Sequence, residues 1–128
     1  MTRGDRYLVC QRPTHKRHGG LWEFPGGKLE PNETIVDAAH RELREELGVY
    51  AVEIHDPALS VCDPGSAFVI HFTPVVIDGE PQCLEHVALQ WLTLSELLDI
   101  PLAPSDRAFV DFLRSRVDGD QHEKDASR

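Results

Sequence analysis

The chain has 128 residues, a length typical of a single domain. Its 41% hydrophobic and 27% charged residues are close to the globular average, which excludes a wholly disordered chain and a collagen-like repeat. The 13 basic and 22 acidic residues give a formal net charge of −9, so we expect neither a nucleic-acid polymer nor a membrane surface as a partner. A phosphate-bearing partner would need a bound cation between it and this acidic chain.

The sequence also carries no signal for membrane insertion or export. No stretch approaches the ~20 apolar residues of a membrane span, and residues 1–6 lack the apolar core of a signal peptide. Cys10, Cys62 and Cys83 are odd in number and far apart, a pattern typical of reduced thiols. We therefore expect a cytoplasmic protein.

The first third of the chain predicts a strand, a loop and a sharp turn. Residues 7–11 are mostly apolar and predict a short strand. Residues 12–20 are basic and end in glycine, which is typical of a loop. A short extended run over 21–24 then ends at Pro25-Gly26-Gly27.

A helix is predicted next, with Asn32 or Thr34 as its N-cap and Gly48 in the left-handed C-cap position. Apolar residues recur every fourth position and predict its buried stripe. The stripe consists of Ile35, Ala39, Leu43 and Leu47.

After this helix the hydrophobic period changes to two, which predicts strands. These strands cover residues 49–54, 58–62, 67–77 and 87–92. A short helix is expected over 95–100, and a final helix from Pro104. The predicted core face of the final helix is Ala108, Phe109, Phe112 and Leu113. The order of elements predicts a single α/β or α+β domain over residues 1–117, and the polar tail over 118–128 is expected to be disordered.

Three glutamates on the long helix form the most informative cluster. Glu42, Glu45 and Glu46 stand at i, i+3 and i+4, so they share one helical face. Like charges so close together are unfavourable unless a cation joins them, and Mg²⁺ or Mn²⁺ suits oxygen ligands. The alternative is a solvated acidic face interleaved with Arg41 and Arg44.

Residues around the cluster favour the metal site. The Gly26-Gly27 turn before the helix allows close approach of a ligand to the backbone. Glu33 can reach Arg41 and hold the loop against the helix, and Arg41 can pair with Glu45 one turn on.

The segment that contains this cluster resembles the Nudix box, G-x5-E-x7-R-E-U-x-E-E-x-G-U, in which U is a bulky aliphatic residue. The matching residues are Gly27, Glu33, Arg41, Glu42, Leu43, Glu45, Glu46, Gly48 and Val49. Residues 20–30, 89–92 and 104–106 are also similar to the MutT subgroup of that family. The resemblance covers about residues 6–114 and implies an α/β/α sandwich with a mixed sheet.

The resemblance further implies an activity. Family members hydrolyse a nucleoside diphosphate linked to another group, with a divalent metal. The MutT subgroup converts nucleoside triphosphates to monophosphate and pyrophosphate, and its best-known substrates are oxidised guanine nucleotides such as 8-oxo-dGTP. We therefore expect a Mg²⁺-dependent 8-oxo-dGTP diphosphatase, with Mn²⁺ as a possible substitute, that sanitises the nucleotide pool in support of DNA repair.

Roles come to individual residues from the same resemblance. The implied metal ligands are the Gly26 carbonyl and the carboxylates of Glu42, Glu45, Glu46 and Glu85. Either Glu42 or Glu85 would be the general base, and Arg41 belongs with the catalytic residues. Gly27, Glu33 and Gly48 would be structural residues of the motif.

Three further residues would bind the substrate. Arg12 matches a nucleotide-contacting arginine, Phe24 could stack on the base, and Asp106 matches the position that contacts the base edge. Because Asp106 opens the final helix, the helix dipole should favour its ionised form. An ionised carboxylate accepts the two donors on the pairing edge of guanine.

Other interpretations remain open at the level of sequence. The substrate could be a cytosine nucleotide or ADP-ribose, and Pro64 stands about where ADP-ribose hydrolases of the family carry a proline. The domain could also be a non-catalytic nucleotide-binding module. No apolar run precedes Tyr7, so the first strand that MutT-like chains carry is expected to be missing.

Overall fold

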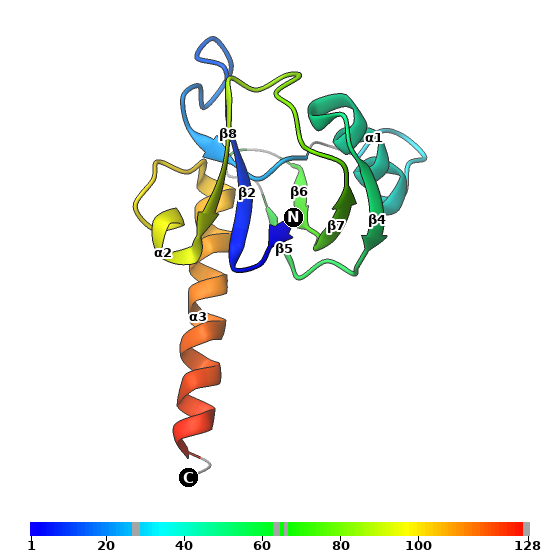
Figure 1. Ribbon diagram of the computed structural model, residues 1–128. Coiled ribbons are helices and arrows are strands. Elements are labelled where there is room, and N and C mark those ends of the chain that lie inside the picture. The colour runs from blue at the N-terminus through cyan, green and yellow to red at the C-terminus, as the bar shows by residue number, and fades with distance from the viewer. Residues whose placement is uncertain (27–28, 63–64, 66, 127–128) are drawn as a thin grey trace.

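The computed structural model describes residues 1–26, 29–62, 65 and 67–126, with side chains as far as residue 117 (Figure 1). The strands are β1 (Thr2–Arg3), β2 (Arg6–Gln11), β3 (Trp22–Glu23), β4 (Tyr50–Ile54), β5 (Leu59–Cys62), β6 (Val69–Phe72), β7 (Val75–Asp78) and β8 (Ala88–Thr93). The helices are α1 (Ile35–Leu47), α2 (Leu94–Leu97) and α3 (Pro104–Ala126). Among the described residues, no helix has both the length and the apolar character needed to cross a bilayer.

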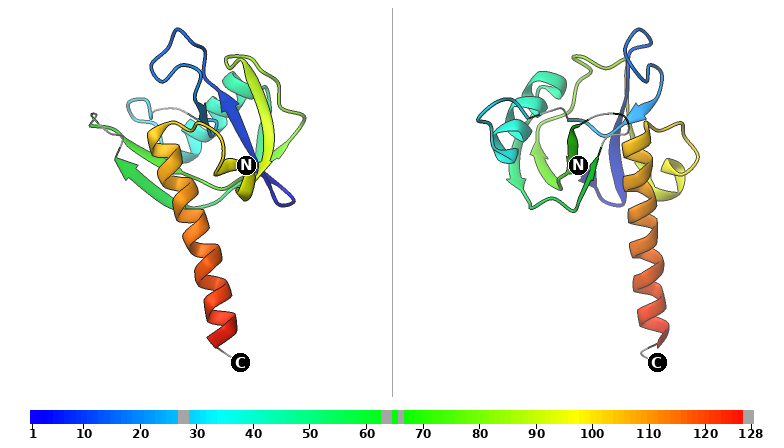
Figure 2. Two further views of the ribbon diagram at one scale, coloured as in Figure 1. Left: turned by 90° about the vertical axis from the view of Figure 1, so that its left-hand side faces the viewer. Right: turned by 180° about the vertical axis from the view of Figure 1, so that it is seen from behind.

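The strands lie between α1 on one side and α2 with α3 on the other (Figures 1 and 2). In the largest sheet β2 pairs with β1, β3 and β8, while β4 pairs with β7 and β5 with β6. All of these ladders are antiparallel, and the parallel component of the predicted mixed sheet is one bridge between Trp22 and Leu102. The arrangement is the α/β sandwich that the sequence predicts.

Strand β2 is the centre of the hydrophobic core because both of its faces are covered. Alternate side chains of a strand point to opposite faces, and Leu8, Val9 and Cys10 are all fully buried. Leu8 and Cys10 pack with Leu43 and Leu47 of α1 in one cluster. Val9 packs in a second cluster with residues of β8, α2 and α3. The sheet is therefore covered on both sides, which explains the unbroken apolar run in this strand.

The predicted strand over 67–77 is two strands in the structure. β6 ends at Phe72 and pairs with β5, whereas β7 begins at Val75 and pairs with β4. The break falls at Thr73-Pro74, because proline has no backbone N–H for a ladder. The prediction of one continuous strand was therefore wrong, and the chain changes sheets at this point.

The buried faces of the two long helices differ in part from the predicted ones. In α1, Leu43 and Leu47 are buried as predicted, but Ala38 is buried while Ile35 and Ala39 are only half-buried. In α3, Phe109 is buried as predicted, while the fully buried Val110 was not predicted. Ala108, Phe112 and Leu113 are half-buried.

Both ends of the chain carry structure that the sequence analysis did not predict. A two-residue exposed strand, β1, precedes β2 and pairs Thr2 with Tyr7 and Arg3 with Arg6. At the other end α3 continues to Ala126, through most of the range 118–128 that was expected to be disordered. The second half of α3 projects away from the sheets (Figure 2). No proline interrupts residues 105–126, and Gly119 is the one residue in this range with a strong preference against a helix.

The chain segment before α3 is attached directly to β3. The Trp22 backbone N–H donates to Pro101 O over 2.8 Å, and the Ala103 N–H donates to Trp22 O over 2.9 Å. These two bonds place the first turn of α3 beside the residues that follow β3. Residues that are more than 80 positions apart, such as Phe24 and Asp106, are thereby brought together.

The ends of α1 are set by local interactions, as the sequence predicts. Thr34 is the N-cap, and its side chain and that of Asp37 form a reciprocal capping box. Gly48 ends the helix with φ of 66°, a left-handed conformation that most residues adopt only with strain.

We expect Gly48→Ala to lower the free energy of unfolding by about 1 kcal/mol. The cost is conformational, because an added Cβ would lie 3.5 Å from Leu84 Cδ1, an ordinary contact. Gly48→Asn is the control, since asparagine tolerates this conformation better and should lose less. Urea unfolding at equilibrium measures both, and equal stability of wild type and Gly48→Ala would contradict the assignment.

Candidate active site

Glu33 and Arg41 join the loop before α1 to the helix. Arg41 Nε and Nη2 donate to the two carboxylate oxygens of Glu33 over 2.7 and 2.9 Å, and the Glu30 backbone N–H donates to the same carboxylate over 2.9 Å. The hydrogen bonds from Arg41, with that from Glu30, lower the pKa of Glu33 to about 2. The predicted contact between Glu33 and Arg41 is confirmed, and its bidentate geometry fixes the loop.

Arg41 also lies among the helix carboxylates. Its Nη1 donates to Glu42 over 2.8 Å and to Glu45 over 3.4 Å. The hydrogen bond with Glu33, and then those with the other carboxylates, raise the pKa of the guanidinium. One half-buried cation thus offsets much of the repulsion that the sequence predicts on this helical face.

Glu46 is outside this arrangement and is deeply buried, with 5% of its surface exposed. Burial raises its pKa to about 9, helped by the nearby carboxylates of Glu42, Glu23 and Glu85 and opposed by a hydrogen bond from the Gly26 backbone. Its Oε2 atom has no hydrogen-bond partner among the described residues. A carboxylate in this environment holds a proton at neutral pH unless a cation replaces it.

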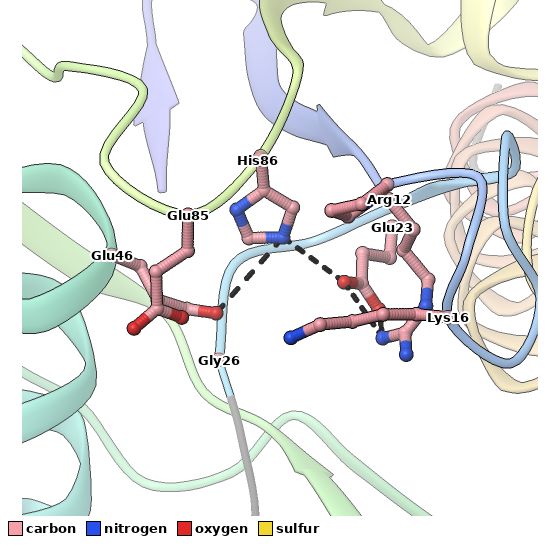
Figure 3. Close-up of a pocket in the computed structure, with 8 residues that line it drawn as sticks. Arg12, Lys16, Glu23, Gly26, Glu46, Glu85 and His86 are labelled. Atoms are coloured by element: carbon pink, nitrogen blue, oxygen red, sulfur yellow. Dashed lines mark hydrogen bonds and ion pairs between the residues drawn. The ribbon is translucent and has the colours of Figure 1, made fainter.

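A small polar pocket opens between α1, the loop after β2 and the loop before β8 (Figure 3). Its lining residues are Arg12, Pro13, Lys16, Glu23, Gly26, Glu46, Glu85 and His86. Gly26 has φ of 151°, a backbone conformation that residues with a Cβ rarely adopt. The pocket therefore brings together four of the predicted site residues: Arg12, Gly26, Glu46 and Glu85.

Two residues of this pocket, Glu23 and His86, were not predicted from the sequence. Glu23 accepts two hydrogen bonds from Arg12 Nη1 over 3.1 and 3.0 Å, and its Oε1 lies 3.0 Å from His86 Nε2 (Figure 3). His86 Nε2 lies 4.0 Å from Glu46 Oε1, and the imidazole is 5% exposed. The network thus links the candidate phosphate-binding arginine to the candidate metal ligand on α1.

A larger groove of about 810 Å³ adjoins the small pocket and includes the other predicted substrate-binding residues. The Phe24 ring makes edge contacts with Tyr7, Phe72 and Phe109, at centroid distances of 6.4, 6.1 and 5.3 Å. The Phe24 backbone N–H donates to Asp106 Oδ1 over 2.8 Å. Arg12, Glu23 and Gly26 line both cavities, so the two are adjacent and share these residues as a common wall.

The charge of Asp106 differs from the sequence-based expectation. The helix N-terminus was expected to favour the ionised form, but Asp106 is only 7% exposed. Burial raises its pKa to about 7, against the opposing hydrogen bond from Phe24. Desolvation therefore outweighs the local dipole, and Asp106 changes charge near neutral pH.

Two predicted ligands stand apart from the small pocket. Glu45 is exposed and Glu42 lines the larger groove, and both accept hydrogen bonds from Arg41. Gly27 and Pro64 lie outside the described residues. Within the described ranges, no three His, Cys, Asp or Glu side chains converge closely enough to form a metal cluster.

The donor set nevertheless fits a hard divalent cation. The carboxylates of Glu46 and Glu85 and the peptide of Gly26 line one pocket, and Glu46 Oε2 is buried with no partner in the part of the chain that the structure describes. Oxygen donors of this kind suit Mg²⁺, which keeps several waters and shares phosphate oxygens. A cation would compensate the buried carboxylate.

The raised pKa of Glu46 predicts how the metal-free protein responds to pH. Between the ordinary carboxyl pKa of 4.5 and about 9, the folded state holds more protons than the unfolded state. The free energy of unfolding should therefore fall as the pH rises through this range. Glu46→Gln removes the titration, so in the presence of a chelator its unfolding free energy should fall less steeply than that of wild type.

Glu45→Gln is the matched control, because the exposed Glu45 should leave the wild-type slope unchanged. Urea unfolding at a series of pH values from 5 to 9 measures the slopes. Identical slopes for Glu46→Gln and wild type would show that Glu46 is ionised in the folded state.

Comparison with known proteins gives a consistent result. The sequence model of the NUDIX domain matches residues 1–113. The chain is 41% identical over 107 residues to the CTP pyrophosphohydrolase of Escherichia coli (strain K12), which covers 81% of this chain and 78% of the relative. It is 35% identical over 126 residues to "Putative 8-oxo-dGTP diphosphatase 2" of Mycobacterium tuberculosis (strain CDC 1551 / Oshkosh), covering 93% of this chain and 86% of the relative.

A solved structure agrees with the fold. The structure of MutT, from work on Aliivibrio salmonicida and Vibrio cholerae, superposes with a TM-score of 0.75 at 28% identity and covers 88% of this chain and 87% of that chain.

Proposed function

Since the chain belongs to the Nudix hydrolase family as a MutT-like member, we propose that it converts nucleoside triphosphates to monophosphates and pyrophosphate with Mg²⁺. Enzymes of this family hydrolyse the diphosphate linkage of small nucleotides and generally use a divalent metal. The finer proposal concerns the triphosphate, the metal ion and the base. Its support lies in the shape and charge of the two adjoining cavities.

The observation that carries the proposal is that the apolar groove and the small polar pocket lie side by side and share a wall. Arg12, Glu23 and Gly26 line both. A nucleotide whose base lies in the groove beside Phe24 and Asp106 can extend its phosphates past Arg12 into the pocket. The phosphate chain then meets the carboxylates that fit Mg²⁺, so the base and the reacting bond have separate, adjacent sites.

The reaction itself needs few groups. Gly26, Glu42, Glu45, Glu46 and Glu85 would hold the metal, which supplies charge neutralisation and activation of water when bound. A water molecule adds to a phosphorus atom beside the α–β bridge, the bridging P–O bond breaks, and a proton is released. Glu42 or Glu85 would accept that proton. Glu42 already accepts a 2.8 Å hydrogen bond from Arg41, whereas Glu85 is exposed at the pocket.

Asp106 supports oxidised guanine nucleotides as substrates above neutral pH. Its ionised carboxylate only accepts hydrogen bonds, and guanine offers the N1–H and 2-amino donors on its pairing edge. Oxidation at C8 leaves that edge unchanged. The relative named an 8-oxo-dGTP diphosphatase is consistent with this substrate.

A cytosine nucleotide is the second candidate, because the raised pKa of Asp106 favours it at lower pH. A protonated carboxyl group offers one donor and one acceptor. Cytosine presents the complement, an acceptor at N3 beside the 4-amino donor. The relative named CTP pyrophosphohydrolase is consistent with this alternative.

The two candidates predict a base preference that changes with pH. Asp106 ionises as the pH rises through about 7, so the ratio of kcat/KM for 8-oxo-dGTP to kcat/KM for dCTP should increase between pH 6 and 8. Asp106→Asn has one donor and one acceptor at every pH, so its ratio should be flat and its kcat/KM for 8-oxo-dGTP about tenfold lower at pH 8. A flat ratio in wild type would exclude Asp106 as the group that reads the base.

The metal assignment is tested by activity. Glu46→Gln should lose most of its pyrophosphate release at saturating Mg²⁺ while remaining folded, because it removes the charge of the buried carboxylate. A panel of 8-oxo-dGTP, dGTP, dCTP, CTP and ADP-ribose with wild-type protein separates the candidate substrates. Near-wild-type turnover by Glu46→Gln would refute the metal role of this residue, and binding without turnover in the whole panel would favour a non-catalytic module.

A further inference from the structure

Lys16 lies on a loop whose backbone is held in place at that residue. The Lys16 N–H donates to Pro13 O over 3.2 Å, and the Lys16 carbonyl accepts from the Gly19 N–H over 2.9 Å. A Cβ at Gly19 would lie 2.4 Å from Thr14 O, so the close turn requires glycine there. These contacts define where the Lys16 side chain leaves the loop.

The loop is also attached to the wall of the small pocket. Arg12 Nε donates to Arg17 O over 2.8 Å, while Arg12 Nη1 is held by Glu23. The Gly20 N–H donates to Arg12 O over 3.0 Å and closes the base of the loop. The loop therefore has a defined position relative to Glu23 and to the pocket that Glu23 lines.

The basic side chains of this pocket differ in the contacts that they make. Arg12 and His86 both contact Glu23. Lys16 has no ion pair or hydrogen bond of its ammonium group with any described side chain, and in Figure 3 its side chain extends toward the carboxylates of Glu46 and Glu85. Its charge is available to a ligand in the pocket.

The position of Lys16 indicates which part of a ligand it meets. Arg12, Glu23 and Gly26 line both the groove and the pocket, whereas Lys16, Glu85 and His86 line the pocket alone. Lys16 therefore contacts the pocket proposed to hold the phosphates and not the groove proposed to hold the base.

From this geometry we propose that Lys16 binds the terminal phosphates of a nucleoside triphosphate and the pyrophosphate product. This inference rests on the proposed function and adds a determinant of phosphate-chain length. A triphosphate carries more negative charge into the pocket than a diphosphate does. The Lys16 ammonium group, which has no ion pair with a described side chain, binds that additional charge. Lys16 therefore favours triphosphates over diphosphates of the same nucleoside.

The test compares wild type with Lys16→Gln, which removes the charge and keeps a polar side chain that is one atom shorter. We expect the KM for the triphosphate that wild type turns over best to rise about five- to tenfold, with kcat within twofold of wild type. Inhibition by pyrophosphate in the presence of Mg²⁺ should weaken by a similar factor. Inhibition by the corresponding nucleoside diphosphate should change less, and inhibition by the monophosphate should not change.

Two control variants accompany this measurement. Lys16→Arg keeps the positive charge and should restore most of the triphosphate affinity. Arg114→Gln makes the same change in net charge at an exposed site on α3 that lines neither cavity, so its kinetic constants should equal those of wild type. An equal rise in KM for Arg114→Gln and Lys16→Gln would show that only the net charge of the protein matters. Equal weakening of binding for mono-, di- and triphosphates would show the same, and either result would overturn the inference.

The inference and the proposed function fail in different ways. If wild type hydrolyses triphosphates and Lys16→Gln keeps the wild-type KM and pyrophosphate inhibition, the role of Lys16 is wrong and the function stands. If wild type hydrolyses no triphosphate, the proposed function is wrong, and calorimetric titration with pyrophosphate and Mg²⁺ decides the inference. Weaker binding by Lys16→Gln supports it, and equal binding refutes it.

Discussion

The structure depends on compensating the repulsion between the carboxylates that share one face of α1. Arg41 makes this possible, since its guanidinium is shared between Glu33 of the preceding loop and Glu42 and Glu45 of the helix. The same contacts fix the loop that leads into α1 and so help to define the wall of the site. Glu46 is deeply buried, and its Oε2 atom has no hydrogen-bond partner among the described residues. The helix is thus stable as a whole while one of its carboxylates remains suited to an external cation.

In the small pocket, too, some charged groups are paired within the protein while others remain available to a ligand. Arg12 is held by Glu23, and Glu23 in turn contacts His86, so these three groups form one internally balanced network. The network lies between the groove and the carboxylates, where a phosphate chain would pass. A chain with net charge −9 repels polyanions at long range. Binding of a nucleotide therefore depends on local cations and on the metal rather than on the field of the whole protein.

Much of this structure could be predicted from the sequence wherever the cause is local. The caps of α1 at Thr34 and Gly48 and the contact between Glu33 and Arg41 follow from spacing along a few helical turns. The contact of His86 with Glu23 spans 63 positions and that of Asp106 with Phe24 spans 82, so no periodicity could indicate them. The prediction that the helix dipole keeps Asp106 ionised was wrong for the same reason. Burial by residues that are distant in the sequence outweighs the local dipole. The break at Pro74 is different, because it could have been predicted from the sequence. Proline lacks the backbone N–H that a continuous strand needs.

The two cavities separate the residues proposed to contact the base from those proposed to bind the metal. The residues proposed to bind metal come from α1, the turn at Gly26 and the loop before β8, whereas the groove is built from Phe24, β6 and the first turns of α3. Among the described residues, only Arg12, Glu23 and Gly26 belong to both. A change at the start of α3 can therefore alter the hydrogen-bonding edge presented to a base without moving the carboxylates on α1. Because Asp106 itself presents two different edges on either side of neutral pH, a single side chain in this position can accommodate either pattern, and the chemistry at the phosphates need not change with it.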